Sequence, residues 1–429
     1  MRHCFMIESV LFLVSVASLS PADIIVPGAD GSDGPFTPTT NVTVDLSAAI
    51  PRVWDSESQI AGRGVYDYDK WAVVFKYASV SIPANVSVTF TNHPSRAPVV
   101  WLVDGDVTIN GNININGKNQ NGPNLALSEP GPGGFRGGHG NSPGNDASAG
   151  YGPGGGGAGQ HGGSYAPTYG NLAILPLIGG SSGGGQRVGQ VTGNSGGGAG
   201  GGALLIIATG TITGNGTISA NGGSGAANCT FGVNGGGGSG GGIRLVADRI
   251  IAPSGSSLQA SGGNGCGGGN GSVGRIRLEA NQITLGGTVS PAPTQAEVGD
   301  PLQIWADMAP RIRISSVGTA QVPTDPRAGL DFPGADAILP DVDEQLVVIE
   351  GADLPLNWLV DVRMLPRYGP EVRTTAILTS GDFQASIWHA TLPIPDGFAA
   401  IQARAYDQTA ATANGEEVEQ PTDSSTADE

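Results

Sequence analysis

The chain alternates apolar and polar residues over short segments, and one pattern of this kind recurs. It appears as VVWLVDGDVTINGNININGKN from Val99, ALLIIATGTITGNGTISANGG from Ala203 and IRLVADRIIAPSGSSLQASGG from Ile243. A shorter copy, RIRLEANQITLGGTVSPAP, begins at Arg275, and a looser one, VVFKYASVSIPANVSVTF, begins at Val73. Each copy is typical of an apolar strand, a corner of two or three residues and further short strands with period two.

The copies predict how the strands stack. One unit cannot bury its apolar side alone, whereas stacked copies share a continuous core. We therefore expect an all-β chain whose residues 73–293 form a right-handed parallel β-helix, a solenoid with Ile, Val and Leu inside and Thr, Ser and Asn outside. The aligned positions are Ala78, Val103, Ala208, Ala247 and Ala280.

Glycine-rich stretches separate the copies. The chain has 73 glycines in 429 residues, and the largest insertion runs from about residue 118 to 202. Such insertions are either flexible loops or ordered chains that use glycine for close backbone approach. Scattered residues such as Phe135, Tyr151 and Leu177 could anchor them, so we expect partial order.

Two cysteines remain after the first 22 residues. Cys229 and Cys266 lie at similar places in successive copies. Stacked strands are about 4.8 Å apart, within the Cα separation that a disulfide spans. The pattern therefore predicts a Cys229–Cys266 disulfide, with two free thiols as the alternative.

The two ends of the chain differ from the repeats. Residues 1–22 have the short apolar run and small residues of a secretory signal peptide, and no segment is apolar for long enough to cross a bilayer. Residues 23–72 are expected to cap the solenoid. Asp30 and Asp33 lie in an Asp-Gly stretch that could bind Ca²⁺, but ordinary turns explain them better.

Glycine becomes scarce after Pro293. Short alternating strands over residues 300–407 predict an immunoglobulin-like β-sandwich, without the cysteine framework of a true immunoglobulin domain. Residues 408–429 are polar and acidic and are expected to form a disordered tail.

The formal net charge of -17 is concentrated in the last part of the chain. Residues 300–429 contain 21 acidic and 7 basic residues. A chain of this charge without a Lys/Arg patch does not suit nucleic acid or an anionic membrane surface.

Several segments look familiar as a set: GADGSDGPFTPTTN, KWAVVFKYASVSIPANVSVTF, NHPSRAPVVWLVDGDVTINGNININGKN and EPGPGGFRGG. They resemble a group of exported, glycine-rich β-helix proteins of environmental bacteria with adhesin-like or surface-protein character. The resemblance covers most of the chain up to about residue 290. It implies no activity and no functional residues.

Candidate chemistry in the repeats is sparse. A polysaccharide-degrading enzyme needs clustered carboxylates or a cation site. The repeats offer Asp104, Asp106, Asp248 and Glu279, together with Arg244, Arg249 and Arg277. Turn and surface roles explain these residues. Gly-x-Ser-x-Gly-like strings near Ser239 lack a strand–elbow–helix context.

Metal-site spacing is also lacking around the histidines His93, His139, His161 and His389. We therefore assign no catalytic, cofactor-binding or metal residue.

These observations predict a non-enzymatic, secreted or cell-surface protein with a structural or adhesive role. The alternatives are a carbohydrate-binding protein and a polysaccharide-degrading β-helix enzyme. Candidate partners are extracellular polysaccharide and other surface proteins, and self-assembly remains open. A flat Asn/Thr face would favour binding, converging carboxylates in a cleft would favour the enzyme, and a self-complementary end would favour assembly.

Overall fold

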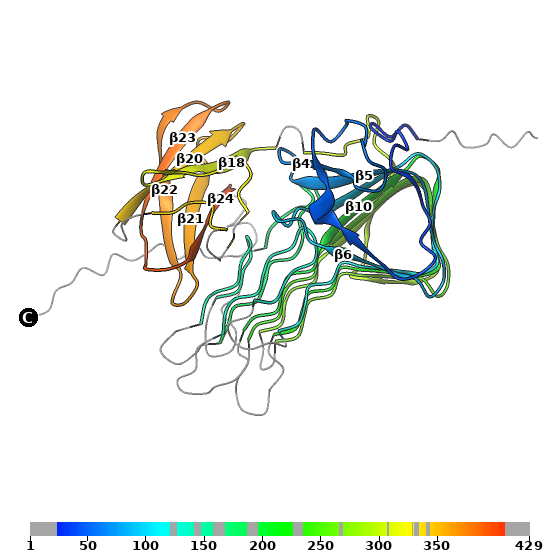
Figure 1. The fold of residues 1–429 in the computed structure, drawn as a ribbon, viewed down its shortest axis with the longest axis horizontal. Helices are drawn as coiled ribbons and strands as arrows, with labels where there is room; N and C mark the ends of the chain where they lie inside the picture. The colour runs from blue at the N-terminus through cyan, green and yellow to red at the C-terminus, as the bar shows by residue number, and fades with distance from the viewer. Residues whose placement is uncertain are drawn as a thin grey trace, which may run out of the picture.

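The structure, a computed structural model, describes residues 24–120, 127–140, 147–157, 168–186, 196–225, 235–265, 269–306, 309–327, 329, 334–339 and 344–407. Strands dominate these residues, which include one short 3-10 helix, η1 (Leu46–Ala48). The prediction of an all-β chain is confirmed. The predicted signal peptide and acidic tail lie outside the described residues. Figure 1 shows two β units side by side, with extended segments running away from the first.

Six strands of the first unit close into a parallel ring, which we call the parallel barrel. The strands are β5 (Ala72–Ile82), β7 (Val99–Val103), β8 (Val107–Ile109), β10 (Ala203–Ala208), β11 (Thr211–Gly214) and β13 (Gly242–Ala252). Around the ring the order is β7, β5, β8, β11, β13, β10 and back to β7. The prediction of a right-handed β-helix solenoid is therefore wrong.

Two long strands account for this difference. The repeat pattern predicts a corner within each of β5 and β13, but both run without a break through 11 residues. The first half of β5 pairs with β7 and the second half with β8. β13 pairs in the same way with β10 and then β11. The hydrogen bonding therefore continues where a solenoid would turn a corner, and it joins the strands into one closed sheet.

A second parallel sheet lies against the same core. Its six strands, in spatial order, are β16 (Thr288–Ser290), β14 (Ser257–Gln259), β12 (Thr217–Ser219), β9 (Asn112–Asn114), β6 (Ser87–Thr91) and β2 (Val42–Asp45). The middle residues Val88, Ile113, Ile218 and Leu258 follow one another across the sheet and are buried in the core. The predicted period-two alternation of apolar and polar residues is confirmed at these strands.

Aromatic packing fixes one end of the core. Trp101 of β7 is the largest fully buried side chain. The ring centroids of Phe36, Tyr77 and Phe90 lie 5.6, 5.5 and 6.4 Å from the ring centroid of Trp101. Burial of an aromatic cluster of this size contributes several kcal/mol to folding.

Further strands extend the sheet of the parallel barrel. They are β1 (Gly34–Phe36), β3 (Ile50–Pro51), β4 (Val65–Asp67), β15 (Arg275–Leu285) and β17 (Thr294–Ala296). A second apolar cluster covers the outer surface of β5, β7 and β10. It includes Val26 from the N-terminal segment and Ile304 and Trp305 from the segment that follows β17.

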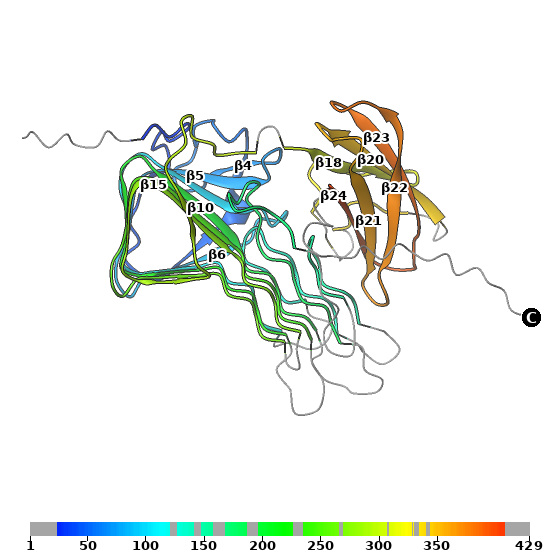
Figure 2. The same ribbon diagram turned by 180° about the vertical axis from the view of Figure 1, so that it is seen from behind.

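The glycine-rich segments are ordered chains without β-strand pairing, and we call them the glycine bundle. They comprise residues 115–120, 127–139, 147–157, 179–186, 196–202, 220–225, 235–241, 260–265 and 269–274. Seen from behind in Figure 2, these chains run alongside one another away from the barrel.

Hydrogen bonds within the glycine bundle have a period of three. Donors three residues apart on one chain reach the same neighbouring chain, and the intervening donors reach two other chains. In residues 235–241, the backbone N–H groups of Gly236 and Ser239 donate to the carbonyls of Gly184 and Ser181 on one neighbouring chain. Those of Gly237 and Gly240 donate to Gly269 and Ser272 on a second chain, and those of Gly238 and Gly241 donate to Gly223 and Ala220 on a third. An extended helix with three residues per turn makes no internal hydrogen bonds, so each chain is held by its neighbours on several sides.

This packing explains the glycine content. A Cβ atom on Gly200 would lie 1.6 Å from the carbonyl oxygen of Gly180, and one on Gly197 would lie 1.8 Å from that of Gly183. Such distances leave no room for a side chain. Of the two interpretations of the insertions, ordered packing therefore holds for the described residues.

The second unit is one antiparallel sheet that curls into a half-barrel. Its order is β19 (Ala320–Gln321), β18 (Arg311–Val317), β20 (Glu344–Ala352), β23 (Ser386–Pro393), β22 (Val372–Gly381), β21 (Leu359–Pro366) and β24 (Ala399–Tyr406). The prediction of an immunoglobulin-like sandwich is wrong. The physical reason is β22, which pairs with β21 along its first half and with β23 along its second half, so the strands form one continuous sheet.

The half-barrel is attached to the first unit by buried contacts. Arg363 is 8% exposed and donates to the carbonyl oxygens of Gly150 (3.0 Å) and Gly152 (3.4 Å) in the glycine bundle. Tyr151 and Leu365 pack together in a small apolar cluster at the same place. These contacts join the two units into one body.

Two further sequence predictions concern cross-links and membranes. The structure contains no disulfide over the residues that it describes, and Cys229 and Cys266 lie outside them, so the predicted disulfide is not retained. Across the described part of the chain, none of the helices has the length and apolar character to span a bilayer.

Candidate functional site

Over β6, β9, β12, β14 and β16, the outer side of the six-stranded sheet carries an uncharged polar surface, which we call the polar face; the edge strand β2 adds the exposed Asp45 beside it. It is formed by Ser, Thr, Asn and Gln side chains on both sides of the buried middle column. Its members are Ser87, Asn112, Asn114, Thr217, Ser257, Gln259, Thr288 and Ser290. Neighbouring strands repeat these groups about every 4.8 Å across the sheet.

Parallel register aligns the groups of the polar face. Asn112 pairs with Thr217, Thr217 with Ser257, and Ser257 with Thr288. At the adjoining corners, Asn215 Nδ2 donates to Asn110 Oδ1 at 2.8 Å. The result is a regular array of hydroxyl and amide groups, each with both donor and acceptor capacity.

Glu279, one of the candidate carboxylates, forms a buried ion pair. Arg244 Nε and Nη2 donate to its two carboxylate oxygens at 2.8 and 3.2 Å, and Arg277 Nε donates at 3.2 Å. Arg244 also donates to the Gln303 carbonyl at 2.8 Å. Glu279 is 6% exposed. Arg244 thereby fixes the segment after β17 against the barrel, while Glu279 holds its guanidinium in place.

The other candidate charges hydrogen-bond to neighbouring layers of the barrel. Asp106 accepts from the Thr211 backbone N–H at 2.7 Å, and Asp248 accepts from Asn281 Nδ2 at 2.9 Å. Arg249 donates to Gln282. Asp104 is exposed at the turn after β7. Because turn and ladder contacts account for Asp106, Asp248 and Arg249, a structural role explains this group best.

Asp33 holds the N-terminal segment together. Its carboxylate accepts from the Ser58 hydroxyl and from the backbone N–H groups of Gly62, Gly64 and Lys76. Asp30 accepts from the Ser32 N–H. Asp30 therefore makes the expected turn contact, whereas the donors to Asp33 lie 25–43 residues further along the chain, so Asp33 joins separate segments.

The histidines lie apart from one another. His93 and His389 belong to different units, His139 lies in the glycine bundle, and His161 lies outside the described residues. Within the described ranges, no group of three or more His, Cys, Asp or Glu side chains is placed to hold a metal ion.

His93 lies where the two units meet. Its ring stacks on Tyr66 with a centroid distance of 3.8 Å, and its Nδ1 accepts from the Ser95 N–H at 3.2 Å. The Tyr66 hydroxyl donates to Asp325 of the second unit at 2.6 Å. Burial lowers the pKa of His93, although the carboxylate of Asp325 opposes this effect and Arg327 adds to it.

This environment predicts acid sensitivity. A His pKa that is lower in the folded chain than its usual value near ~6.5 means that the unfolded chain binds the proton first. Stability should therefore fall as the pH drops below about 6.5, by at most about 1.4 kcal/mol per pH unit from this group. Denaturant unfolding between pH 5 and 8 measures the slope.

A variant identifies the group responsible for this slope. Asn at position 93 keeps an acceptor for the Ser95 N–H but does not titrate, so His93→Asn should flatten the pH dependence. An unchanged slope in His93→Asn would assign the acid sensitivity to other groups.

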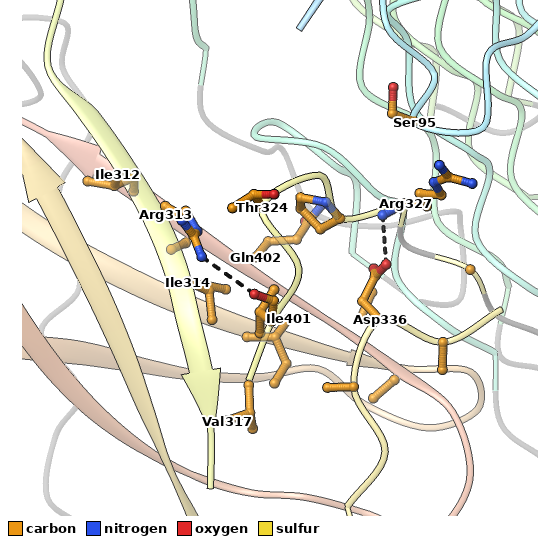
Figure 3. A pocket seen from close by; sticks show the side chains of 18 of the residues that line it. Ser95, Ile312, Arg313, Ile314, Val317, Thr324, Arg327, Asp336, Ile401 and Gln402 are labelled. Atoms are coloured by element: carbon orange, nitrogen blue, oxygen red, sulfur yellow. Dashed lines mark hydrogen bonds between the residues drawn. The ribbon is translucent and has the colours of Figure 1, made fainter. Parts of the chain in front are cut away.

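A large cleft separates the half-barrel from the first unit. Its volume is about 1460 Å³, and residues of both units line it. Figure 3 shows Ile312, Arg313 and Ile314 of β18 on one side and Ser95 of the first unit on the other. The first unit also contributes Trp71 and, from the glycine bundle, Phe135 and Tyr151.

Sequence reasoning missed the cleft. Its lining residues come from segments more than 200 positions apart, and Trp71 and Arg96 have no motif around them. The one local signal was the presence of aromatic residues among the glycines. The sequence alone indicates these residues only as anchors of the glycine-rich insertions. The polar face, in contrast, follows from the period-two alternation.

Comparison with known protein families, curated proteins and solved structures finds no significant match to this chain.

Proposed function

We propose that this chain is an exported, non-enzymatic adhesive protein that attaches to neutral extracellular polysaccharide through its polar face. The observation that supports this proposal is the regular, uncharged array of Asn, Ser, Thr and Gln side chains. A polysaccharide presents repeated hydroxyl groups, and each amide or hydroxyl of the face can donate to and accept from them.

The binding affinity of such a surface comes from the repetition of its polar groups. A single hydrogen bond exchanged with water contributes only about 0.5–1.5 kcal/mol. Several weak contacts on one rigid face act together, because the first contact raises the effective concentration of the next. The resulting attachment needs no deep pocket and no charged group.

The candidate carboxylates support the non-enzymatic part of the proposal. Glu279 is fixed by Arg244 and Arg277, and Asp106 and Asp248 are engaged by neighbouring strands. General acid–base hydrolysis needs two carboxyl groups that flank the glycosidic bond. The contacts of these three side chains are those of structural groups.

Two added charges on the polar face test the proposal. Asn112 and Thr288 are exposed and lie three strands apart on the sheet. In the variant Asn112→Glu/Thr288→Glu, binding to insoluble neutral glucans and xylans should fall at least about tenfold, because carboxylates would lose water without gaining partners. A depletion isotherm on each polymer measures the loss.

A matched variant controls for net charge. Ser380→Glu/Thr391→Glu adds the same two charges at exposed positions of the half-barrel and should bind like the unmodified chain. Equal loss in both variants, or no loss in either, would contradict attachment through the polar face.

A further inference from the structure

The cleft between the two units has the size and position of a ligand site separate from the polar face. At about 1460 Å³ it exceeds the usual ~300–1,000 Å³ of a small-molecule pocket. Clefts between structural units are also a frequent location for ligands. The volume therefore suits a ligand of several linked rings better than a single small molecule.

Aromatic side chains of the first unit line the cleft. Trp71 and Phe135 lie with ring centroids 6.4 Å apart, and Trp71 Nε1 donates to the Ser95 carbonyl at 3.1 Å, which fixes the indole. Tyr68 also lines the cleft and is 53% exposed. Rings held in this way offer apolar faces to the C–H side of a ring-shaped ligand.

Two cleft residues have a strained backbone. Trp71 and Arg96 have φ values of 47° and 58°, in the left-handed region that L-residues other than Asn and Asp seldom adopt. Backbone strain of this kind persists where the surrounding structure holds a residue in place, and strained residues are often found at binding sites. Both residues contribute side chains to the cleft.

Planar polar groups also line the cleft. Arg96 and Arg327 line the cleft together with Asp336 and Gln402. Arg96 Nη1 donates to the Arg327 carbonyl at 3.2 Å, and the Arg327 N–H donates to Asp336 Oδ1 at 2.8 Å, so these groups hold one another in position. Guanidinium, carboxylate and amide groups can each engage two adjacent hydroxyls.

The charges of the cleft are nearly balanced, with five arginines and four carboxylates in its lining. Arg96, Arg136, Arg311, Arg313 and Arg327 face Asp69, Asp336, Glu350 and Asp396. Arg313 and Glu350 are also cross-strand neighbours on β18 and β20. A balanced lining selects neither an anion nor a cation and favours a neutral, polar ligand.

The hydroxyl of Tyr151 is the strongest single indication that the cleft binds a ligand. Tyr151 lines the cleft, is 6% exposed, and its hydroxyl has no hydrogen-bond partner among the described residues. Burial raises its pKa to about 12, so the hydroxyl stays protonated and able to donate. A buried polar group without a partner is costly, and a ligand hydroxyl would satisfy it.

From these observations we infer that the cleft between the first unit and the half-barrel binds a neutral oligosaccharide. The aromatic side stacks on its rings, the planar polar groups of Arg96, Arg327 and Gln402 contact its hydroxyls, and the Tyr151 hydroxyl donates to one of them. This site is independent of the polar face.

Titration of the full chain with soluble hexasaccharides tests the inference. The probes are the β-1,4-glucan, β-1,3-glucan and β-1,4-xylan hexamers and, as a carboxylated arm, the α-1,4-galacturonan hexamer. We expect calorimetry to show binding of at least one neutral hexamer, with a change in tryptophan fluorescence from Trp71. No binding of any neutral hexamer, or binding of the galacturonan hexamer alone, would overturn the inference.

Two variants locate the binding. Tyr151→Phe removes only the hydroxyl and should weaken the neutral hexamer about fivefold without lowering the unfolding temperature. Trp71→Ala should weaken it more than about tenfold. Tyr406→Phe, whose hydroxyl donates to Asp361 outside the cleft, should leave binding unchanged.

The outcomes of the two sites are separable. Asn112→Glu/Thr288→Glu should keep full affinity for the soluble hexamer, because neither residue lines the cleft. Unchanged affinity in both Tyr151→Phe and Trp71→Ala would place the bound sugar elsewhere and overturn the inference.

Discussion

Replacing Gly200 by alanine should destabilise the chain by about 3 kcal/mol or more. The new Cβ would lie 1.6 Å from the Gly180 carbonyl oxygen and 2.3 Å from its carbon. Overpacking of a well-packed interior typically costs ~1–3 kcal/mol. Here the clash is with backbone, and relieving it would break the bonds that Gly200 and its neighbours make to surrounding chains. Thermal unfolding of the purified variant measures the effect.

Gly214 provides the matched control. It lies at the end of β11, where a Cβ would meet nothing within 4 Å and φ is not positive. Gly214→Ala should be neutral or slightly stabilising, because alanine restricts the unfolded chain. Equal stability of Gly200→Ala and Gly214→Ala would mean that the glycine chains do not pack as described.

Removing the carboxylate of Glu279 should cost about 3–5 kcal/mol. Breaking a buried ion pair on one side leaves the other charge without compensation. In Glu279→Ala the guanidinium of Arg244, which is 2% exposed, would keep only the Gln303 carbonyl as a hydrogen-bond acceptor. Denaturant unfolding of the variant gives the free energy of unfolding.

A double variant separates the ion pair from simple packing. Arg244→Met/Glu279→Leu replaces both charges by apolar side chains of similar length, which is often neutral at buried pairs. Most of the stability lost in Glu279→Ala should therefore return. A double variant as unstable as Glu279→Ala would show that volume, and not the unpaired charge, sets the cost.

The sequence predicted much of the strand register. Val103 and Ala208, aligned from the repeats, are direct partners, as are Ala247 and Ala280. At the first copy the alignment is one residue off, since Tyr77 rather than Ala78 pairs with Val103. Register is recoverable because a one-residue slip would turn every apolar side chain outward.

The closure of the barrel was not predictable from the same pattern. In β13 the polar pair Asp248-Arg249 resembles a corner, but the strand continues through it. Arg249 pairs with Gln282 of β15 and Thr211 of β11, and the Asp248 N–H donates to the Gly210 carbonyl. The half-barrel has the same origin, since β22 bends between two neighbours within one strand. Alternation specifies which face is buried but not whether a strand bends or ends.

The structure of the glycine bundle could not be predicted from strand (period-two) or helical periodicity. Its chains repeat every three residues, and glycine at nearly every position hides that period. The three-fold pattern becomes visible only in the hydrogen bonds, as when Gly198 and Gly201 both reach residues of the 235–241 chain. Composition indicates that glycine is needed, but the structure shows which backbone occupies the space.

The two candidate binding surfaces differ in how well the sequence predicts them. The polar face is local, because Asn112, Thr217 and Ser257 occupy equivalent places in successive copies of the repeat. The cleft depends on how the half-barrel sits on the first unit through Arg363 and Tyr66. No local pattern in either segment encodes that contact.

The most direct test of the proposed function combines binding and catalysis in one tube. The purified chain is mixed with insoluble neutral polysaccharides, and both the protein left in solution and the sugar released are measured. We predict depletion of the protein without release of sugar, and loss of depletion in Asn112→Glu/Thr288→Glu. Release of sugar, or failure to bind any of the polymers, would contradict a non-enzymatic adhesive role.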